Sequence, residues 1–111
     1  MITLKPLSEQ ANHCIAEAQL CYSTCVICIS QHPGEQMMAE CIRTCLECIA
    51  TTQACGHLLA AESPLAKQAC ALCADSCERC YNECKDHDNP SCKQCAEACR
   101  KCMESCRAMA A

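Results

Sequence analysis

The chain has 111 residues, a net charge of −4 and 18 cysteines, and it contains no Phe or Trp. This length predicts a single domain, and the absence of a basic run argues against nucleic acid as a partner. No stretch approaches the roughly 18 apolar residues of a membrane span, so no membrane contact is expected. Residues 1–7 lack the apolar run of a signal peptide. The sequence therefore predicts a cytoplasmic protein with reduced thiols.

Three proline-containing breaks divide the domain, residues 1–111, into four similar pieces. Proline fits the first turn of a helix and a preceding Ser or Asn makes a good N-cap, so Ser63 and Asn89 are expected caps, as is Ser8. Helices are predicted near 8–31, 35–60, 64–86 and 90–109. Links of about three residues force neighbouring helices to run antiparallel. The predicted fold class is all-α, an antiparallel up-down-up-down four-helix bundle.

Cysteines recur three or four residues apart in each predicted helix. Because one turn takes about 3.6 residues, these gaps place the thiols on one helix face. Only Ala18 and Thr52 interrupt the columns. The chain has just 15 Leu, Ile or Val residues, so we expect a cysteine-lined core that its ligand helps to stabilise. The predicted metal ligands are Cys14, Cys21, Cys25, Cys28, Cys41, Cys45, Cys48, Cys55, Cys70, Cys73, Cys77, Cys80, Cys84, Cys92, Cys95, Cys99, Cys102 and Cys106.

Several interpretations of so many thiols compete. Disulfides are disfavoured, because positions along one helix have poor geometry and helix axes 8–10 Å apart usually exceed the reach of an S–S bond. Zinc and iron–sulfur sites gather cysteines on turns, and several buried Zn(Cys)4 sites, each with charge −2, would be costly to desolvate. Cysteine as an ordinary apolar core residue does not explain a column of this length.

Cu(I) fits the pattern better. It is a soft ion that prefers thiolate, and a pair four residues apart, such as Cys21 with Cys25, can chelate one ion. One Cu⁺ per thiolate leaves a neutral core, and binding releases the thiol protons. If each sulfur bridges two ions, the capacity approaches one Cu(I) per cysteine, on the order of 18 ions.

With its inward cysteine columns and C-x2-C-x3-C repeats across residues 8–109, the chain resembles the bacterial cytosolic copper storage proteins, the Csp family. The resemblance implies a four-helix bundle that fills with Cu(I) after folding. It also implies a homotetramer and a role in storing copper and limiting its toxicity. Bulky residues beside the thiol column of the first two helices either pack the flanks of the bundle or form a subunit contact.

One end of the bundle is the predicted mouth for copper. There His32, Met38 and His87 continue the cysteine register, and imidazole and thioether are weaker ligands that can hand an ion inward. At the other end, His13 and His57 are out of register and are expected at the surface, and only Met109 continues the register. The three mouth residues are therefore added to the predicted metal ligands.

Other functions fit less well. A copper metallochaperone usually exposes one Cys-x-x-Cys pair and binds one ion, whereas these ligands are many and buried. A zinc-binding cysteine-rich protein remains an alternative. No Ser/His/Asp grouping or phosphate loop appears, and two glycines exclude a Gly-rich loop, so no enzyme is predicted.

Overall fold

The computed structural model describes residues 6–111, and this part of the chain forms four long α-helices and no β-strand. The bounds of the elements are α1 Glu9–Gln31, η1 Gln36–Met38, α2 Ala39–Ala60, α3 Ala66–Cys84 and α4 Pro90–Ala110, where η1 is a short 3₁₀-helix. The predicted all-α class is confirmed. The second expected helix begins as the 3₁₀ turn η1 and becomes α-helical only at Ala39.

Two of the three expected N-caps are present. The Ser8 hydroxyl accepts a hydrogen bond of 3.0 Å from the Ala11 N–H, and the Asn89 side chain accepts one of 2.8 Å from the Cys92 N–H. Ser63 does not cap α3, because this helix begins two residues later than expected. Its hydroxyl instead accepts the Leu65 N–H at 3.0 Å and closes a turn ahead of the helix.

The connections between helices contain the residues with positive φ. Gly34, with φ of 72°, lies between α1 and η1, where the absence of a Cβ makes this conformation accessible. Glu62 has φ of 51° immediately after α2, and the Ser63 N–H bonds back to the Leu58 carbonyl oxygen at 3.0 Å. This is the six-to-one hydrogen bond of a Schellman C-cap, which turns the chain sharply toward α3.

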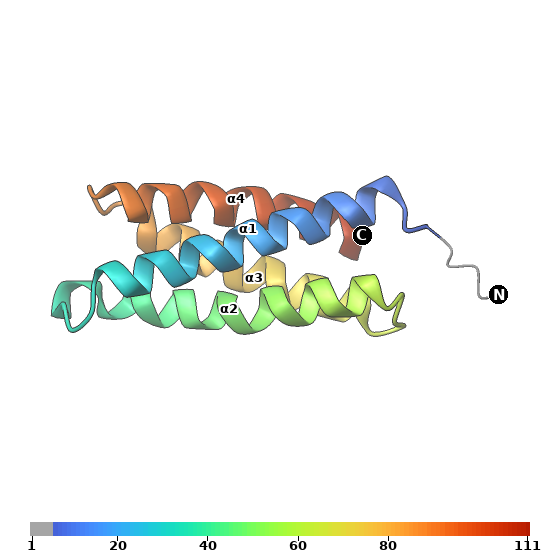
Figure 1. The fold of residues 1–111 in the computed structure, drawn as a ribbon, viewed down its shortest axis with the longest axis horizontal. Helices are drawn as coiled ribbons and strands as arrows, with labels where there is room; N and C mark the ends of the chain where they lie inside the picture. Colours follow the sequence, from blue (N-terminus) through green and yellow to red (C-terminus); the bar gives the residue numbers. More distant parts are fainter. Residues whose placement is uncertain (1–5) are drawn as a thin grey trace.

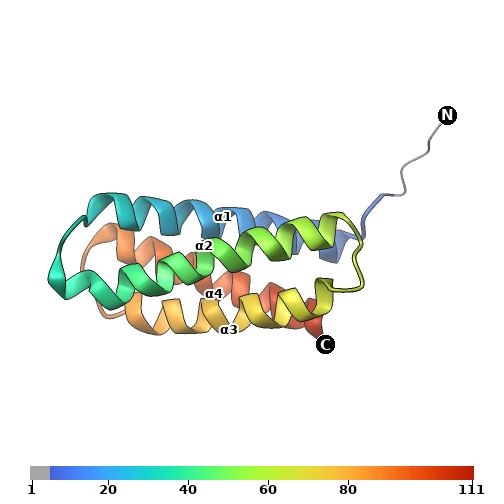
Figure 2. The same ribbon diagram turned by 90° about the horizontal axis from the view of Figure 1, so that it is seen from below.

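Successive helices alternate in direction, and α1 and α4 complete the ring of neighbours (Figures 1 and 2). The resulting bundle is elongated, with extents of 53 × 28 × 19 Å. Up-down-up-down order brings the start of α1 beside the end of α4, where the sulfurs of Cys14 and Cys106 lie 3.7 Å apart. Among residues 6–111, no helix combines the length and apolar character that a bilayer span requires.

Sulfur, rather than aliphatic carbon, fills the core. Leu59 is the one Leu, Ile or Val side chain of residues 6–111 that is buried, and Ile15, Ile29, Ile42 and Ile49 pack against the core from its edge. The remaining buried apolar residues are cysteines, alanines and Met38. As the sequence predicts, the core is therefore lined by cysteines.

Candidate metal centre

Cysteines on neighbouring helices meet at matching heights along the bundle. At the end that contains η1, the Cys28 sulfur lies 3.9 Å from that of Cys41 and 3.8 Å from that of Cys92. At the opposite end, the sulfurs of Cys55 and Cys106 are 3.7 Å apart. Because the helices are antiparallel and share the same spacing, each helix contributes one position to each level.

In the described part of the chain, the core positions form five layers. The first, second, third and fifth layers from the η1 end each hold one cysteine from every helix. The fourth layer holds only two cysteines, because α1 and α2 place Ala18 and Thr52 there. From the η1 end, the layers are Cys28/Cys41/Cys84/Cys92, then Cys25/Cys45/Cys80/Cys95, Cys21/Cys48/Cys77/Cys99, Cys73/Cys102 and finally Cys14/Cys55/Cys70/Cys106.

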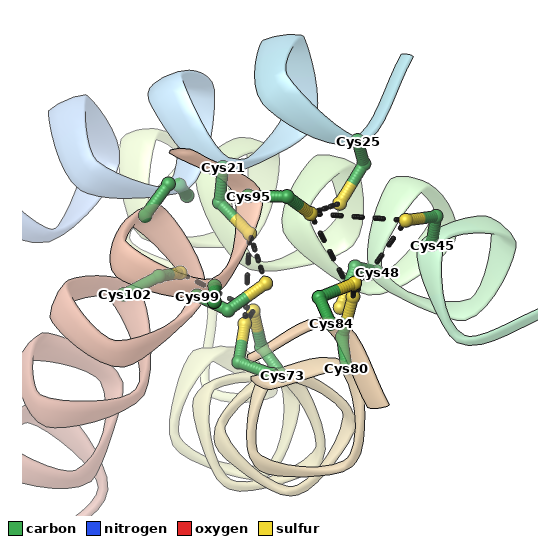
Figure 3. Packing of buried hydrophobic residues seen from close by; sticks show 14 of the residues in the cluster. Cys21, Cys25, Cys45, Cys48, Cys73, Cys80, Cys84, Cys95, Cys99 and Cys102 are labelled. Atoms are coloured by element: carbon green, nitrogen blue, oxygen red, sulfur yellow. Dashed lines mark hydrogen bonds between the residues drawn. The ribbon is translucent and has the colours of Figure 1, made fainter. Parts of the chain in front are cut away.

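All eighteen cysteines lie within residues 6–111, and none is more than 1% exposed. The cysteines labelled in Figure 3 come from all four helices, and their sulfurs point into the space between them. None is paired in a disulfide. Diagonal helices are linked as well, since the Cys21 and Cys77 sulfurs lie 3.8 Å apart and those of Cys45 and Cys95 lie 3.7 Å apart. The interior is therefore a continuous body of thiols.

The spacing of the sulfurs suits shared metal ions. Two thiolates on one ion, at the roughly 2.3 Å metal–sulfur distance known for zinc, lie at most about 4.6 Å apart. Several groups have all their sulfurs within 4.8 Å of one another. They include Cys25/Cys45/Cys80/Cys95, Cys28/Cys41/Cys45/Cys84, Cys21/Cys25/Cys48/Cys99, Cys14/Cys55/Cys70 and Cys21/Cys77/Cys102. Because these groups share members, one sulfur can bridge ions in adjacent groups.

Two effects set the acidity of the thiols. Burial raises the pKa of Cys92 to about 12 from its ordinary value of 9.0, because a thiolate is poorly solvated inside the bundle. Hydrogen bonds between thiols act in both directions, because one thiol of a pair donates and the other accepts. They raise the pKa of thiols such as Cys84 and Cys99 and lower that of others. The Cys106 thiol lowers the pKa of Cys14 to about 4, and chiefly the Cys25 thiol lowers that of Cys95 to about 6. Some thiols of the core thus favour the charged form, while the thiols that donate to them stay protonated.

A family model described as copper storage protein matches residues 4–111 of the chain. The chain belongs to the copper storage protein family. A comparison with curated proteins finds no match. This membership agrees with the copper-storage function that the sequence predicts.

Solved structures of the same family have the same fold. The Cu(I)-bound copper storage protein BsCsp3 is 37% identical with a TM-score of 0.88, over 93% of this chain and 100% of that one. Apo-Csp3 from Bacillus subtilis is 38% identical with a TM-score of 0.85, over 91% and 99%. A cytosolic copper storage protein from Streptomyces lividans, loaded with five coppers, is 28% identical with a TM-score of 0.86, over 92% of both chains. The predicted four-helix bundle is confirmed.

The three predicted mouth residues of this copper storage protein all lie at the η1 end. Met38 is 5% exposed and belongs to the core cluster. His87 follows α3 and is half-buried. The His32 ring is held on both sides, with Nδ1 2.6 Å from the Glu35 carboxylate and Nε2 2.9 Å from the Ser91 hydroxyl. His32 must therefore give up a hydrogen bond before it can bind an ion, whereas Met38 already lies in the core.

Apolar side chains cover the opposite end of the bundle. Leu59 continues the register of α2 beyond Cys55 and is 6% exposed, and Ala11 is buried beside it. Met109 joins them around a groove of about 490 Å³. The His13 side chain is 65% exposed, as expected from its position outside the cysteine register. Beyond the last layer of sulfurs, the buried positions at this end are thus aliphatic, and the Met109 thioether lies at the edge of the core.

Sequence reasoning missed the surroundings of Cys48. Its thiol donates to the Ser76 carbonyl oxygen at 3.3 Å, and the Ser76 hydroxyl lies 2.6 Å from that of Thr51. It also missed that the two interruptions of the cysteine columns share one layer. That coincidence was visible in principle, since Ala18 and Thr52 lie at similar distances from the turn that joins their antiparallel helices.

Proposed function

We propose that this copper storage protein stores Cu(I) ions on its interior thiolates, about one ion per cysteine, and so limits copper toxicity. It acts by storage rather than catalysis. The observation that carries the proposal is the burial of eighteen thiols in layers, with no aqueous surface between them. Soft thiolate ligands select Cu(I), and sulfurs within 4.8 Å of one another can share ions.

Charge favours Cu(I) over zinc in this interior. A Cu⁺ ion bound per thiolate leaves no net charge, whereas each Zn(Cys)4 site keeps a charge of −2 that burial would penalise. Basic side chains do not offset this charge, since Arg79, Arg100 and Arg107 form ion pairs on the outside of the bundle. A metallochaperone is disfavoured because it needs an exposed cysteine pair, and every cysteine here is buried.

Copper passes through a mouth at the η1 end. The support is the difference between the two ends. The Met38 thioether is buried above the first layer of sulfurs, and His32 and His87 lie at the same end. At the other end the buried residues beyond the sulfurs are Leu59 and Ala11, and the Met109 thioether is only partly buried at the edge of the core. His87 stands beside this end and can deliver an ion to the Met38 thioether or the Cys84 thiolate. His32 contributes once its hydrogen bonds to Glu35 and Ser91 break.

The proposed setting is a homotetramer in the cytoplasm. Apolar side chains on the outside of α1 and α2 support an assembly, because Leu20 is 50% exposed, Ile27 44% and Leu46 55%. Burying these side chains against another subunit would remove apolar surface from water. The similar protein from Streptomyces lividans is described as cytosolic, and reduced thiols suit that compartment.

An anaerobic Cu(I) titration of the reduced protein against a competing Cu(I) chelator tests the function. We expect saturation near one ion per cysteine, about eighteen per chain. A parallel titration with Zn²⁺ serves as the control and should saturate at far fewer ions. Saturation with one or two Cu(I) ions would contradict storage and favour a chaperone or a structural site.

A further inference from the structure

The body of thiols narrows at one layer. In the fourth layer from the η1 end, the sulfurs of Cys73 and Cys102 lie 3.9 Å apart, and α1 and α2 contribute Ala18 and Thr52. Both replacements are buried, at 1% and 3% exposure, so they occupy core positions without offering sulfur. We refer to Cys73 and Cys102 as the neck.

Neither replacement can substitute for a thiolate. Ala18 has no ligand atom. The Thr52 hydroxyl donates to the Cys48 carbonyl oxygen at 2.6 Å, and a neutral hydroxyl is in any case a poor ligand for a soft ion. On the outside of the same level, a groove of about 290 Å³ between α1 and α2 is lined by Ala18, Thr52 and Gly56. The thiols are therefore confined to the α3–α4 half of this layer.

Sulfur contacts on either side of the neck lead into the complete layers. The Cys73 sulfur lies 4.0 Å from that of Cys77 in the third layer. The Cys102 sulfur lies 3.8 Å from that of Cys106 in the last layer. Within residues 6–111, the sulfur contacts that join the third layer to the last one all pass through these two residues. We call the last layer, made of Cys14, Cys55, Cys70 and Cys106, the far layer.

We infer that the neck controls the filling of the far layer. This inference rests on the proposed function and on the mouth at the η1 end. It divides the store into a twelve-thiol compartment near the mouth and the four thiols of the far layer, joined by Cys73 and Cys102. Copper loaded at the mouth reaches the far layer only after it has been bound by this pair.

Each transfer through the neck is a ligand exchange. A Cu–S bond to Cys73 forms as the bond to Cys77 breaks, and the ion then passes in the same way to Cys102 and Cys106. Copper remains Cu(I) throughout. The thiol that accepts the ion passes its proton to the thiolate that releases it, so no oxidant or external base is consumed. With sulfurs 3.8–4.0 Å apart, an ion can touch the next ligand before it leaves the last.

The decisive experiment compares two double variants that each remove two thiols. Cys73→Ser/Cys102→Ser removes the neck, while Cys55→Ser/Cys70→Ser removes two ligands of the far layer, whose sulfurs are 3.4 Å apart, and leaves the acceptor Cys106 in place. Anaerobic loading is followed by counting bound Cu(I) after the time in which the unchanged protein saturates. The neck variant should lose about six ions and the control about two. Equal losses of about two would overturn the inference and show another route to the far layer.

A variant that widens the neck tests the same inference if the first one fails to fold. Ala18→Cys/Thr52→Cys completes the fourth layer, so the last ions should bind several-fold faster and the capacity should rise by about two. Unchanged kinetics of the last ions would refute control by the neck. Failure of the proposed function would look different: the unchanged protein would bind only one or two Cu(I) ions.

Discussion

Met38 is the residue on which the proposed mouth depends most. It is 5% exposed, continues the core beyond the first layer of sulfurs and precedes Cys41 by one helical turn. A thioether is soft but neutral, so it binds Cu(I) more weakly than a thiolate does and can release the ion inward. His87 lies at the same end and offers an imidazole nitrogen.

Replacing both residues separates uptake from capacity. The variant Met38→Ala/His87→Ala should load Cu(I) about tenfold more slowly, because an arriving ion loses its first ligands, yet it should still bind about eighteen ions. Stopped-flow mixing with a chromophoric Cu(I) complex measures the rate. His13→Ala/His57→Ala, at the opposite end, is the matched control and should load normally. Equal rates for both variants would argue against a mouth at the η1 end.

At the scale of the helices, the turn between α2 and α3 carries a conformational strain. Glu62 adopts φ of 51°, a conformation that costs a residue with a Cβ roughly 1–2 kcal/mol. Glycine fits this position of a Schellman cap without that cost, although it loses more entropy on folding.

The variant Glu62→Gly should therefore be more stable than the unchanged protein, by about 0.5–1 kcal/mol. Urea unfolding of the metal-free protein measures the difference in the free energy of unfolding. Gln53→Gly, at an exposed position inside α2, is the control and should destabilise by about 1 kcal/mol. If Glu62→Gly lowers the free energy of unfolding as much as Gln53→Gly does, Glu62 is not strained in the native structure.

Much of the helical arrangement could be predicted from the spacing of cysteines and prolines. Alternating gaps of three and four residues define one helix face, and Asn89 before Pro90 marks the start of α4. The role of Ser63 could not be predicted, because its hydroxyl serves the turn at Leu65 rather than the helix. The hydrogen bond between His32 and Ser91 was equally hidden, since Ser91 is distant in sequence and meets His32 only in the folded bundle.

For the whole molecule, the buried thiols link stability to pH. Burial raises the pKa of Cys70, and it raises that of Cys92 from 9.0 to about 12. The folded state thus keeps these thiols neutral where the unfolded chain would ionise them. This contribution to stability is complete below about pH 9 and is lost as the pH rises toward 12.

The metal-free protein should accordingly lose stability between pH 9 and pH 12, while the Cu(I)-loaded protein, whose thiols have already lost their protons, should lose less. Thermal unfolding followed by circular dichroism at a series of pH values measures both. In Cys92→Ser the alkaline loss should be smaller than in the unchanged metal-free protein. An identical pH dependence in that variant would show that Cys92 does not contribute.

The layered register also determines how such a molecule can change in size. A seven-residue insertion in each helix adds about 10.5 Å of length and two further layers, because two turns of the cysteine pattern span seven residues. The cross-section, 28 × 19 Å here, would not change. Capacity is therefore proportional to helix length, and insertions or deletions of whole heptads, matched across the bundle, could enlarge or shrink the reservoir without a new fold.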